Sequence, residues 1–157
     1  MDDRVEQCAH EILETVPVVM RYIRDQVRRR QAGGLSLPQF RTLTFLKRVR
    51  NASLSAVAEH LGLSLPAMSR LINGLVAGRL VGRQTVSTNR RQVALTLTAR
   101  GRVTLEEARG KIRLRLAEAV KDLAPAEQKT ILRAMGILQE VFDQRTVSNG
   151  SPKKAET

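Results

Sequence analysis

The 157-residue chain has one cysteine, no tryptophan, one tyrosine and three phenylalanines. A single cysteine cannot form an intrachain disulfide, so the fold depends on a hydrophobic core. This cysteine content is consistent with a protein in a reducing compartment. No run of about 18 consecutive apolar residues is present, as a membrane-spanning helix would require. The first residues, MDDRVEQCAHEILE, are acidic and amphipathic and do not resemble a signal peptide. We therefore expect a soluble, cytoplasmic protein with one compact domain and helical extensions.

Acidic residues are nearly absent from the middle of the chain. Residues 26–105 contain fourteen basic residues and one acidic residue, Glu59, for a net charge of +13. The flanking segments 1–25 and 106–157 carry net charges of −3 and +2. This distribution indicates a surface that binds a polyanion. The alternative is a basic face kept for solubility, although solubility does not require acids to be excluded from so long a segment.

The scarcity of aromatic residues narrows the choice of polyanion. Proteins that bind single-stranded nucleic acid stack bases on exposed rings, and residues 46–105 of the basic segment contain no aromatic residue. A membrane-surface helix would place aromatic residues opposite lysines, whereas this segment is rich in arginine and broken by turns. Duplex DNA is the partner that remains.

Residues that could support catalysis are also missing. His10 and His60 are the only histidines, and neither has a second histidine or cysteine at metal-ligand spacing. No phosphate-binding glycine loop or nucleophile elbow is present, so we expect neither an enzyme nor a cofactor or metal. Acidic neighbours disfavour the thiolate form of Cys8, which predicts a structural or surface cysteine and not a peroxide sensor.

The spacing of apolar residues predicts a series of helices. A first long helix has its apolar stripe from Val5 to Val27 and ends before Gly33. Ser36 has the character of an N-cap, with Pro38 in the first turn of a second helix. A third helix begins at Ser53 or Ser55 and ends at Gly62.

The stretch SLPAMSRLINGL, residues 64–75, predicts the helix that meets DNA. Ser64 is a suitable N-cap, and Met68, Leu71, Ile72 and Leu75 have the spacing of a buried face. The opposite face has residues that are small or can form hydrogen bonds, as a helix needs for close approach in a major groove: Pro66, Ala67, Ser69, Arg70, Asn73 and Ala77. Many core helices have a similar outer face. This pattern alone therefore does not distinguish a DNA-reading helix from an ordinary core helix.

A basic hairpin follows this helix. Residues 80–86 and 92–97 are predicted to be strands, and the residues between them include Asn89, Arg90 and Arg91. Arginines at such a tip suit contact with the DNA backbone or a narrow minor groove. Taken alone, the segment could equally be an ordinary solvated turn.

Residues 35–102 resemble the MarR-type transcriptional regulators, through LSLPQFRTL, LSAVAEHLGLSLPAMSRLINGL, LVGR and NRRQVALTLTARG. The resemblance implies a dimeric winged helix-turn-helix repressor, mainly α with a small β wing, in which residues 64–77 form the recognition helix and residues 89–91 the wing tip. Where the family usually has Asp at the first wing-tip position this chain has Asn89, a neutral acceptor that holds arginines less firmly than a carboxylate. The residues that we expect at the DNA are Ser53, Ser64, Pro66, Ala67, Ser69, Arg70, Asn73, Arg83, Asn89, Arg90 and Arg91.

Two further helices follow Thr98, a predicted N-cap, and Pro125, and their apolar stripes exceed what the central module needs. We expect an N-terminal dimerisation helix (1–34), a winged helix-turn-helix DNA-binding domain (35–102), C-terminal dimerisation helices (103–147) and a disordered tail (148–157). Helices folded back within one chain are the alternative to a dimer.

The predicted function is a sequence-specific repressor of a pseudo-palindromic operator in duplex DNA. The resemblance implies release by a small anionic or aromatic effector. The alternative is an architectural DNA-binding protein without sequence preference.

Overall fold

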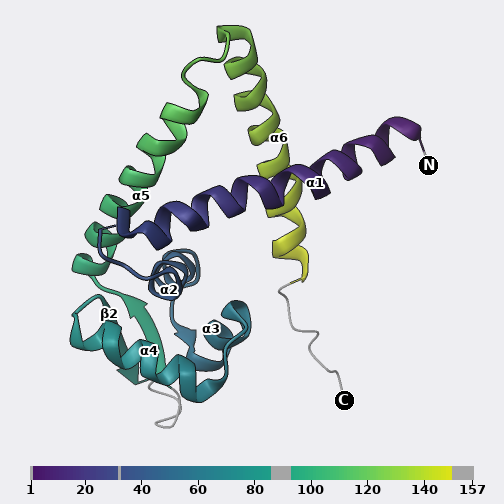
Figure 1. Ribbon diagram of the computed structural model, residues 1–157. Coiled ribbons are helices and arrows are strands. Elements are labelled where there is room, and N and C mark those ends of the chain that lie inside the picture. The colour runs from purple at the N-terminus through teal and green to yellow at the C-terminus, as the bar shows by residue number, and fades with distance from the viewer. Residues whose placement is uncertain (1, 32, 86–92, 150–157) are drawn as a thin grey trace, which may run out of the picture. The chain divides into compact units, whose positions relative to one another are not determined.

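The computed structural model describes residues 2–31, 33–85 and 93–149 (Figure 1). The elements in chain order are α1 (Asp3–Gln26), a π-helical turn (Val27–Gln31), α2 (Leu37–Arg48), β1 (Ala52–Ser53), α3 (Leu54–Leu61), α4 (Leu65–Ala77), β2 (Val81–Thr85), β3 (Val93–Leu97), α5 (Ala99–Val120) and α6 (Pro125–Asn149). Contacts within the chain define two compact units, residues 1–115 and 116–157. The expected fold class, mainly α with a small β wing, is confirmed.

Helix starts in the first unit follow the predicted capping residues. Ser36 forms a capping box with Gln39 at the start of α2, and the Ser53 hydroxyl caps α3. Ser64 caps α4, with its hydroxyl oxygen accepting from the backbone N–H of Ala67 at 3.3 Å. Gly62 ends α3 with φ of 69°, a left-handed conformation that favours glycine. These predictions are confirmed. The caps could be predicted because they depend on hydrogen bonds between near neighbours in sequence.

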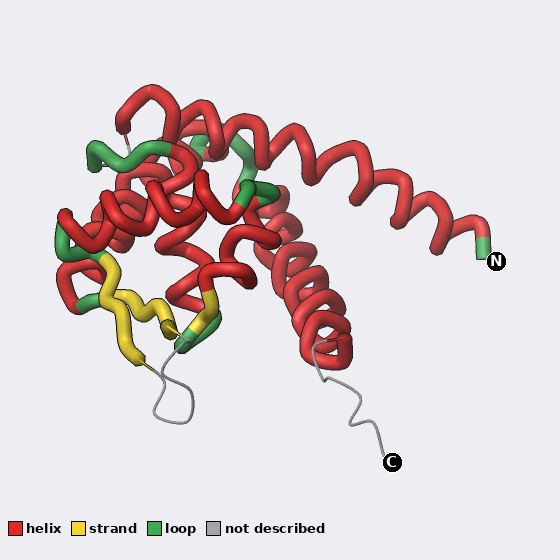
Figure 2. The backbone as a smooth tube through the Cα atoms, turned by 90° about the horizontal axis from the view of Figure 1, so that it is seen from below, coloured by secondary structure: helices red, strands yellow, loops and turns green. Residues whose placement is uncertain are grey.

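The sheet is three-stranded and antiparallel in the order β1–β3–β2, and Figure 2 shows its strands together on one side of the first unit. β2 and β3 pair from Val81 opposite Leu97 to Thr85 opposite Val93, as the predicted hairpin requires. The two residues of β1 pair with Leu95 and Ala94 and were not predicted. A two-residue strand is too short to show an alternating pattern, and only its pairing with β3 defines it.

The core of the first unit lies where α2, α3, α4 and α5 meet the sheet. Its fully buried side chains include Leu43, Met68, Ile72, Leu75, Leu95 and Leu105. The predicted buried face of α4 is confirmed, although Leu71 is only half-buried. α5 contributes Leu105, Ala108 and Ile112 to this core, whereas α1 has no buried residue. The core therefore belongs to the central module, and most of α1 lies outside it.

The wing is joined to α5 at a close backbone contact. The Thr98 hydroxyl accepts from the backbone N–H of Gly101 at 2.9 Å, so Thr98 is the N-cap of α5 as predicted. The Thr98 hydroxyl also lies 2.7 Å from the carbonyl oxygen of Arg79, to which it can donate. A Cβ at Gly101 would be 2.1 Å from the Leu80 carbonyl oxygen. Only glycine permits this approach of α5 to the turn before β2.

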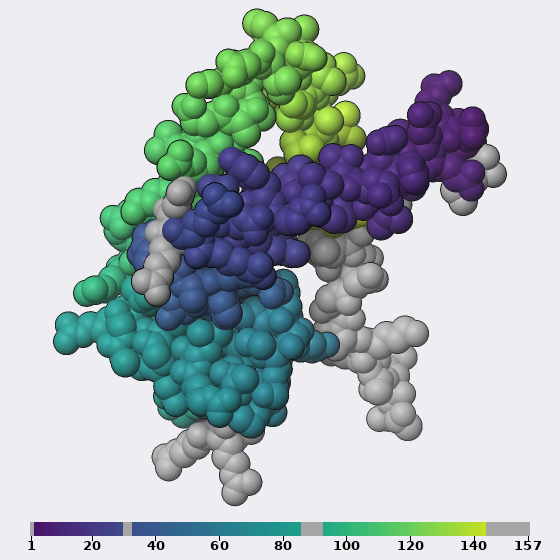
Figure 3. All heavy atoms as spheres, viewed as in Figure 1, coloured from purple at the N-terminus to yellow at the C-terminus, as the bar shows by residue number. Residues whose placement is uncertain are grey.

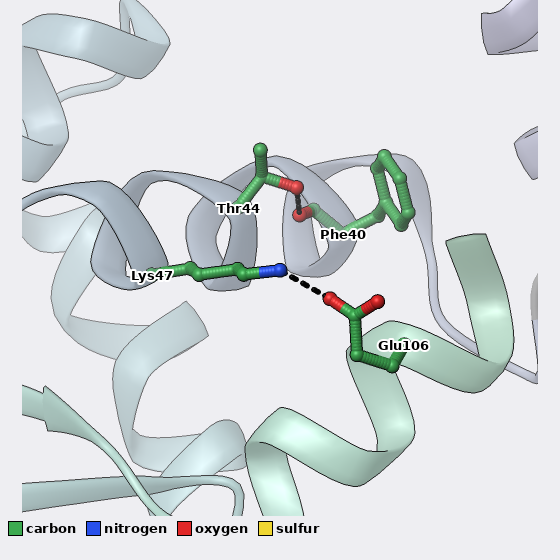
Figure 4. A network of polar contacts seen from close by, with 4 residues as sticks. All are labelled: Phe40, Thr44, Lys47 and Glu106. Carbon is green, nitrogen blue, oxygen red and sulfur yellow. Dashed lines mark hydrogen bonds and ion pairs between the residues drawn. The ribbon is translucent and has the colours of Figure 1, made fainter. Parts of the chain in front are cut away.

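An ion pair joins α2 to α5 at the surface. Figure 4 shows the Lys47 ammonium of α2 directed at the Glu106 carboxylate of α5, and the two groups form a hydrogen-bonded salt bridge. The same view shows Thr44, whose hydroxyl donates to the Phe40 carbonyl at 2.8 Å. The hydrogen bond from Lys47 lowers the pKa of Glu106 below its usual value, and the nearby positive charges act in the same direction.

The second unit contains the end of α5 and α6. α6 begins at Pro125 as predicted and runs to Asn149, two residues beyond the predicted end of the C-terminal helices at residue 147. No glycine or proline occurs between Ile137 and Ser148, and Gly150 is the first residue that disfavours helix continuation. Residues 150–157 lie outside the described part of the chain. Ile131, Met135 and Phe142 of α6 are all exposed.

Candidate nucleic-acid interface

The helices α3 and α4 form the helix-turn-helix element predicted from the sequence. The backbone N–H of Leu63 donates to the Ala58 carbonyl at 3.0 Å, which ends α3 in a tight turn, and Ser64 starts α4 directly afterwards. α3 packs against α4, and α4 also packs against β2. In Figure 3 these elements form one compact lobe, drawn in teal. The packing holds α4 by its buried face and leaves the opposite face at the surface.

α4 carries five of the eleven side chains that were expected to meet DNA. Pro66, Arg70 and Asn73 are exposed, whereas Ala67 and Ser69 are half-buried. Within the described part of the chain, the Arg70 guanidinium makes no hydrogen bond or ion pair. A long cation at the surface of a helix, without a partner, is suited to contact a phosphate or a base edge.

The expected serines at the DNA have a structural role as well. The Ser53 hydroxyl oxygen accepts from the backbone N–H of Ala56 at 3.1 Å, and Ser64 makes the equivalent contact in α4. Both residues are exposed, and each hydroxyl keeps its own proton for donation. The N-terminus of a helix favours negative charge, so the exposed start of α4 is compatible with a phosphate.

Arg83 on β2 contacts α4. Its guanidinium Nη2 donates a hydrogen bond to the side-chain oxygen Oδ1 of Asn73, so that two predicted DNA-binding residues meet although they lie on different elements. Arg83 and its neighbours Gln84 and Thr85 are exposed. The wing-tip residues Asn89, Arg90 and Arg91 lie outside the described residues.

His60, at the end of α3, lies in a cluster of basic residues that the sequence pattern did not reveal. Its ring stacks on Phe45 of α2 with centroids 4.5 Å apart, and its carbonyl oxygen accepts from Arg41 at 3.4 Å. Partial burial lowers the pKa of His60 below its usual value, and the charges of Arg41 and Arg48 lower it further. Since Arg41 and His60 are 19 residues apart, only the packing of α2 on α3 brings them together.

The described residues show neither a metal centre nor a membrane-spanning helix. No three or more His, Cys, Asp or Glu side chains there lie close enough together to hold a metal ion. No helix in that part of the chain has the length and apolar character to cross a membrane. Cys8 is exposed on α1.

Comparison with known proteins identifies the winged helix-turn-helix module. Residues 33–92 match the model of the MarR family. The HTH-type transcriptional repressor Rv2887 of Mycobacterium tuberculosis is 28% identical over 102 residues, which cover 65% of this chain and 73% of that protein. The crystal structure of RV1404 from the same species has a TM-score of 0.66 and 25% identity, with coverage of 99% of this chain and 100% of that one. A MarR family protein from Bacillus stearothermophilus has a TM-score of 0.67 and 17% identity, with coverage of 91% and 99%.

Proposed function

We propose that the chain is a winged helix-turn-helix transcriptional regulator of the MarR family, and that it acts as a dimeric repressor of one pseudo-palindromic operator and not as an enzyme. The match of residues 33–92 to that family's model and the similarity to the repressor Rv2887 support this proposal. The observation that carries this proposal is the exposed face of α4, with Arg70 and Asn73, inside a segment of net charge +13. A basic surface provides affinity for any duplex, whereas side chains on a helix in the major groove provide sequence preference.

Dimer formation is supported by apolar residues at the surface of the outer helices. In α1, Leu13 is 69% exposed and Val18 52%, and in α6 Leu132 is 74% exposed and Ile137 52%. An isolated chain would leave these side chains in water, at a cost of about 25 cal/mol for each Å² of apolar surface. We assign residues 1–34 and 103–147 to the dimer interface and residues 35–102 to DNA binding.

Two copies related by a twofold axis would place their α4 helices in successive major grooves, about one helical turn apart. Ser53, Ser64, Pro66 and Ala67 would then lie near the phosphates, and Ser69, Arg70 and Asn73 near base edges. Arg83, beside α4, would lie near the backbone, and the wing-tip residues Asn89, Arg90 and Arg91 would contact the backbone or the minor groove.

The proposal is tested by footprinting and by selection of bound fragments from random DNA. A repressor should protect one twofold-symmetric site of roughly 15 to 25 base pairs, with an affinity that falls steeply with salt. Equal affinity for scrambled sequence, with uniform protection, would instead identify an architectural protein that coats the duplex through phosphate contacts.

Variants separate the wing from α4. Arg91→Ala should weaken binding to operator and unrelated DNA together and lower the salt slope by about one unit for each phosphate interaction that it removes. Arg70→Ala should flatten the preference at particular base pairs, by about 1–3 kcal/mol of discrimination, and leave non-specific binding closer to wild type. Thermal melting must show that Arg70→Ala is folded. The assignment of α4 as the reading helix fails if Arg91→Ala changes base preference and Arg70→Ala only lowers affinity uniformly.

We also propose that a small anionic or aromatic effector releases the protein from DNA, as the resemblance to the MarR family implies. Such a ligand would have to bind the DNA-free dimer more tightly than the DNA-bound dimer, because only a difference in affinity shifts the equilibrium. Titration of the operator complex with aromatic carboxylates, followed by fluorescence anisotropy of labelled DNA, tests this directly. Release should be saturable and should leave the salt dependence of the remaining complex unchanged.

A further inference from the structure

The contact between Arg83 and Asn73 fixes the orientation of a side chain on the proposed reading face. Arg83 is on the same face of β2 as the buried Val81, two residues closer to the wing tip, and this places it beside α4 at the edge of the core. Asn73 follows the buried Ile72 on α4. Among the described residues, the bond from Arg83 Nη2 to Oδ1 is the one hydrogen bond that the Asn73 side chain makes.

The two ends of an asparagine amide differ in chemistry. Oδ1 only accepts hydrogen bonds and Nδ2 only donates them, and an unpartnered amide can turn either end outward. A guanidinium has five N–H donors and no acceptor, so Arg83 can bond only the oxygen end. The hydrogen bond is charge-assisted and therefore stronger than a bond between neutral groups. With Oδ1 held toward β2, the Nδ2 donors of Asn73 face away from Arg83.

This orientation restricts the bases that Asn73 can recognise. In the major groove guanine presents two acceptors, N7 and O6, whereas adenine presents one acceptor and one donor. The usual asparagine contact to adenine needs both ends of the amide on the same base edge. We propose that Arg83 is a positioning residue that holds Asn73 as a hydrogen-bond donor, so that Asn73 selects a G·C pair over an A·T pair. The proposal rests on the proposed function, since it requires α4 to lie in the major groove.

The experiment begins with the wild-type protein and selection from random duplex DNA. If no recurrent twofold-symmetric motif is selected, the proposed function itself fails, and the role of Arg83 is contradicted with it. If a motif appears, the same selection with Asn73→Ala identifies the symmetric pair of positions that Asn73 reads. Wild type should prefer G·C over A·T there by about 5- to 100-fold, the range of one good base contact, and Asn73→Ala should bring this ratio close to one.

Variants of Arg83 then test the positioning role at a selected motif. Arg83→Gln replaces a donor-only group by an amide that can donate or accept, so it no longer fixes Asn73, and the preference should shift toward A·T at the same positions. Arg83→Lys keeps a donor-only cation and should keep G·C preferred. Arg100→Gln removes one charge from an exposed position in the first turn of α5, outside the proposed dimer interface, and should lower affinity without changing any base ratio.

Three results would overturn the proposal while the proposed function stands. The first is a motif whose base ratios are all unchanged in Asn73→Ala. The second is a G·C preference that disappears in Arg83→Gln but is kept in Asn73→Ala, which would mean that Arg83 reads the base directly. The third is an equal decrease of affinity for all sequences in Arg83→Gln, as expected for a phosphate contact alone. Thermal melting of each variant distinguishes these results from unfolding, and the double variant should show no further change in base ratio beyond Asn73→Ala.

Discussion

Replacement of Gly101 by alanine should destabilise the protein, although alanine is the better helix former. A Cβ at this position would lie 2.1 Å from the carbonyl oxygen of Leu80 and 2.9 Å from Cδ1 of Leu97. The leucine side chain could rotate, but the carbonyl oxygen is backbone. It is held in place by the Thr98 backbone N–H at 3.2 Å and is within reach of the Thr98 hydroxyl at 3.1 Å. The start of α5 or the turn before β2 would have to move.

The change in the free energy of unfolding caused by Gly101→Ala has three contributions. Alanine instead of glycine inside a helix gains about 1 kcal/mol. Overpacking at a filled site costs about 1–3 kcal/mol, and the upper part of this range applies here because the obstacle is a backbone atom. Displacement of the Thr98 cap costs about 1 kcal/mol more. We expect a net decrease of about 2–3 kcal/mol in the free energy of unfolding.

Urea denaturation followed by far-ultraviolet circular dichroism measures this decrease, at one fixed protein concentration because dimer formation affects apparent stability. Gly110→Ala is the matched control, since it lies in the same helix and its new Cβ would meet only the Arg113 Nη2, at 3.8 Å. This control should gain up to about 1 kcal/mol. If both variants gain stability equally, α5 does not pack on the Leu80 carbonyl as described.

Three other predictions concern individual side chains. Ser64→Ala should cost about 0.5–2 kcal/mol of stability through removal of the α4 cap, and an unchanged urea midpoint would contradict this. The lowered pKa of His60 means that its protonation opposes folding. The contribution of His60 to the free energy of unfolding should therefore be fully present above about pH 6.5 and should be lost as the pH falls below that value. His60→Gln should make urea midpoints between pH 7 and pH 5 less dependent on pH than in wild type. Mild peroxide should leave operator binding unchanged in wild type and in Cys8→Ser alike, and release from wild type alone would establish Cys8 as a redox sensor.

The sequence predicted those features that depend on neighbours in the chain. Ser36, Ser53, Ser64 and Thr98 cap helices through bonds to residues three positions later, and such bonds can be recognised from spacing. The buried stripe of α4 was predictable for the same reason.

Features that need two distant segments to meet were not predictable. The strand β1 exists only through its pairing with β3. Arg83 could be placed on a strand and Asn73 on a helix, but their contact depends on how β2 packs against α4. The requirement for glycine at position 101 likewise comes from the approach of Leu80, which no pattern within α5 indicates.

The hydrogen bonds of Thr98 also have a consequence for how the wing can change over evolution. The Thr98 N–H and hydroxyl join the chain after the wing to Leu80, the residue before it, so the segment between them is a loop closed at its base. The entropy of closing such a loop grows slowly with length, by about 0.6 kcal/mol for each doubling. Residues at the tip can therefore be inserted, deleted or replaced at small cost while α4 and α5 keep their places. In the proposed complex, affinity for the DNA backbone could in this way be adjusted separately from the choice of bases.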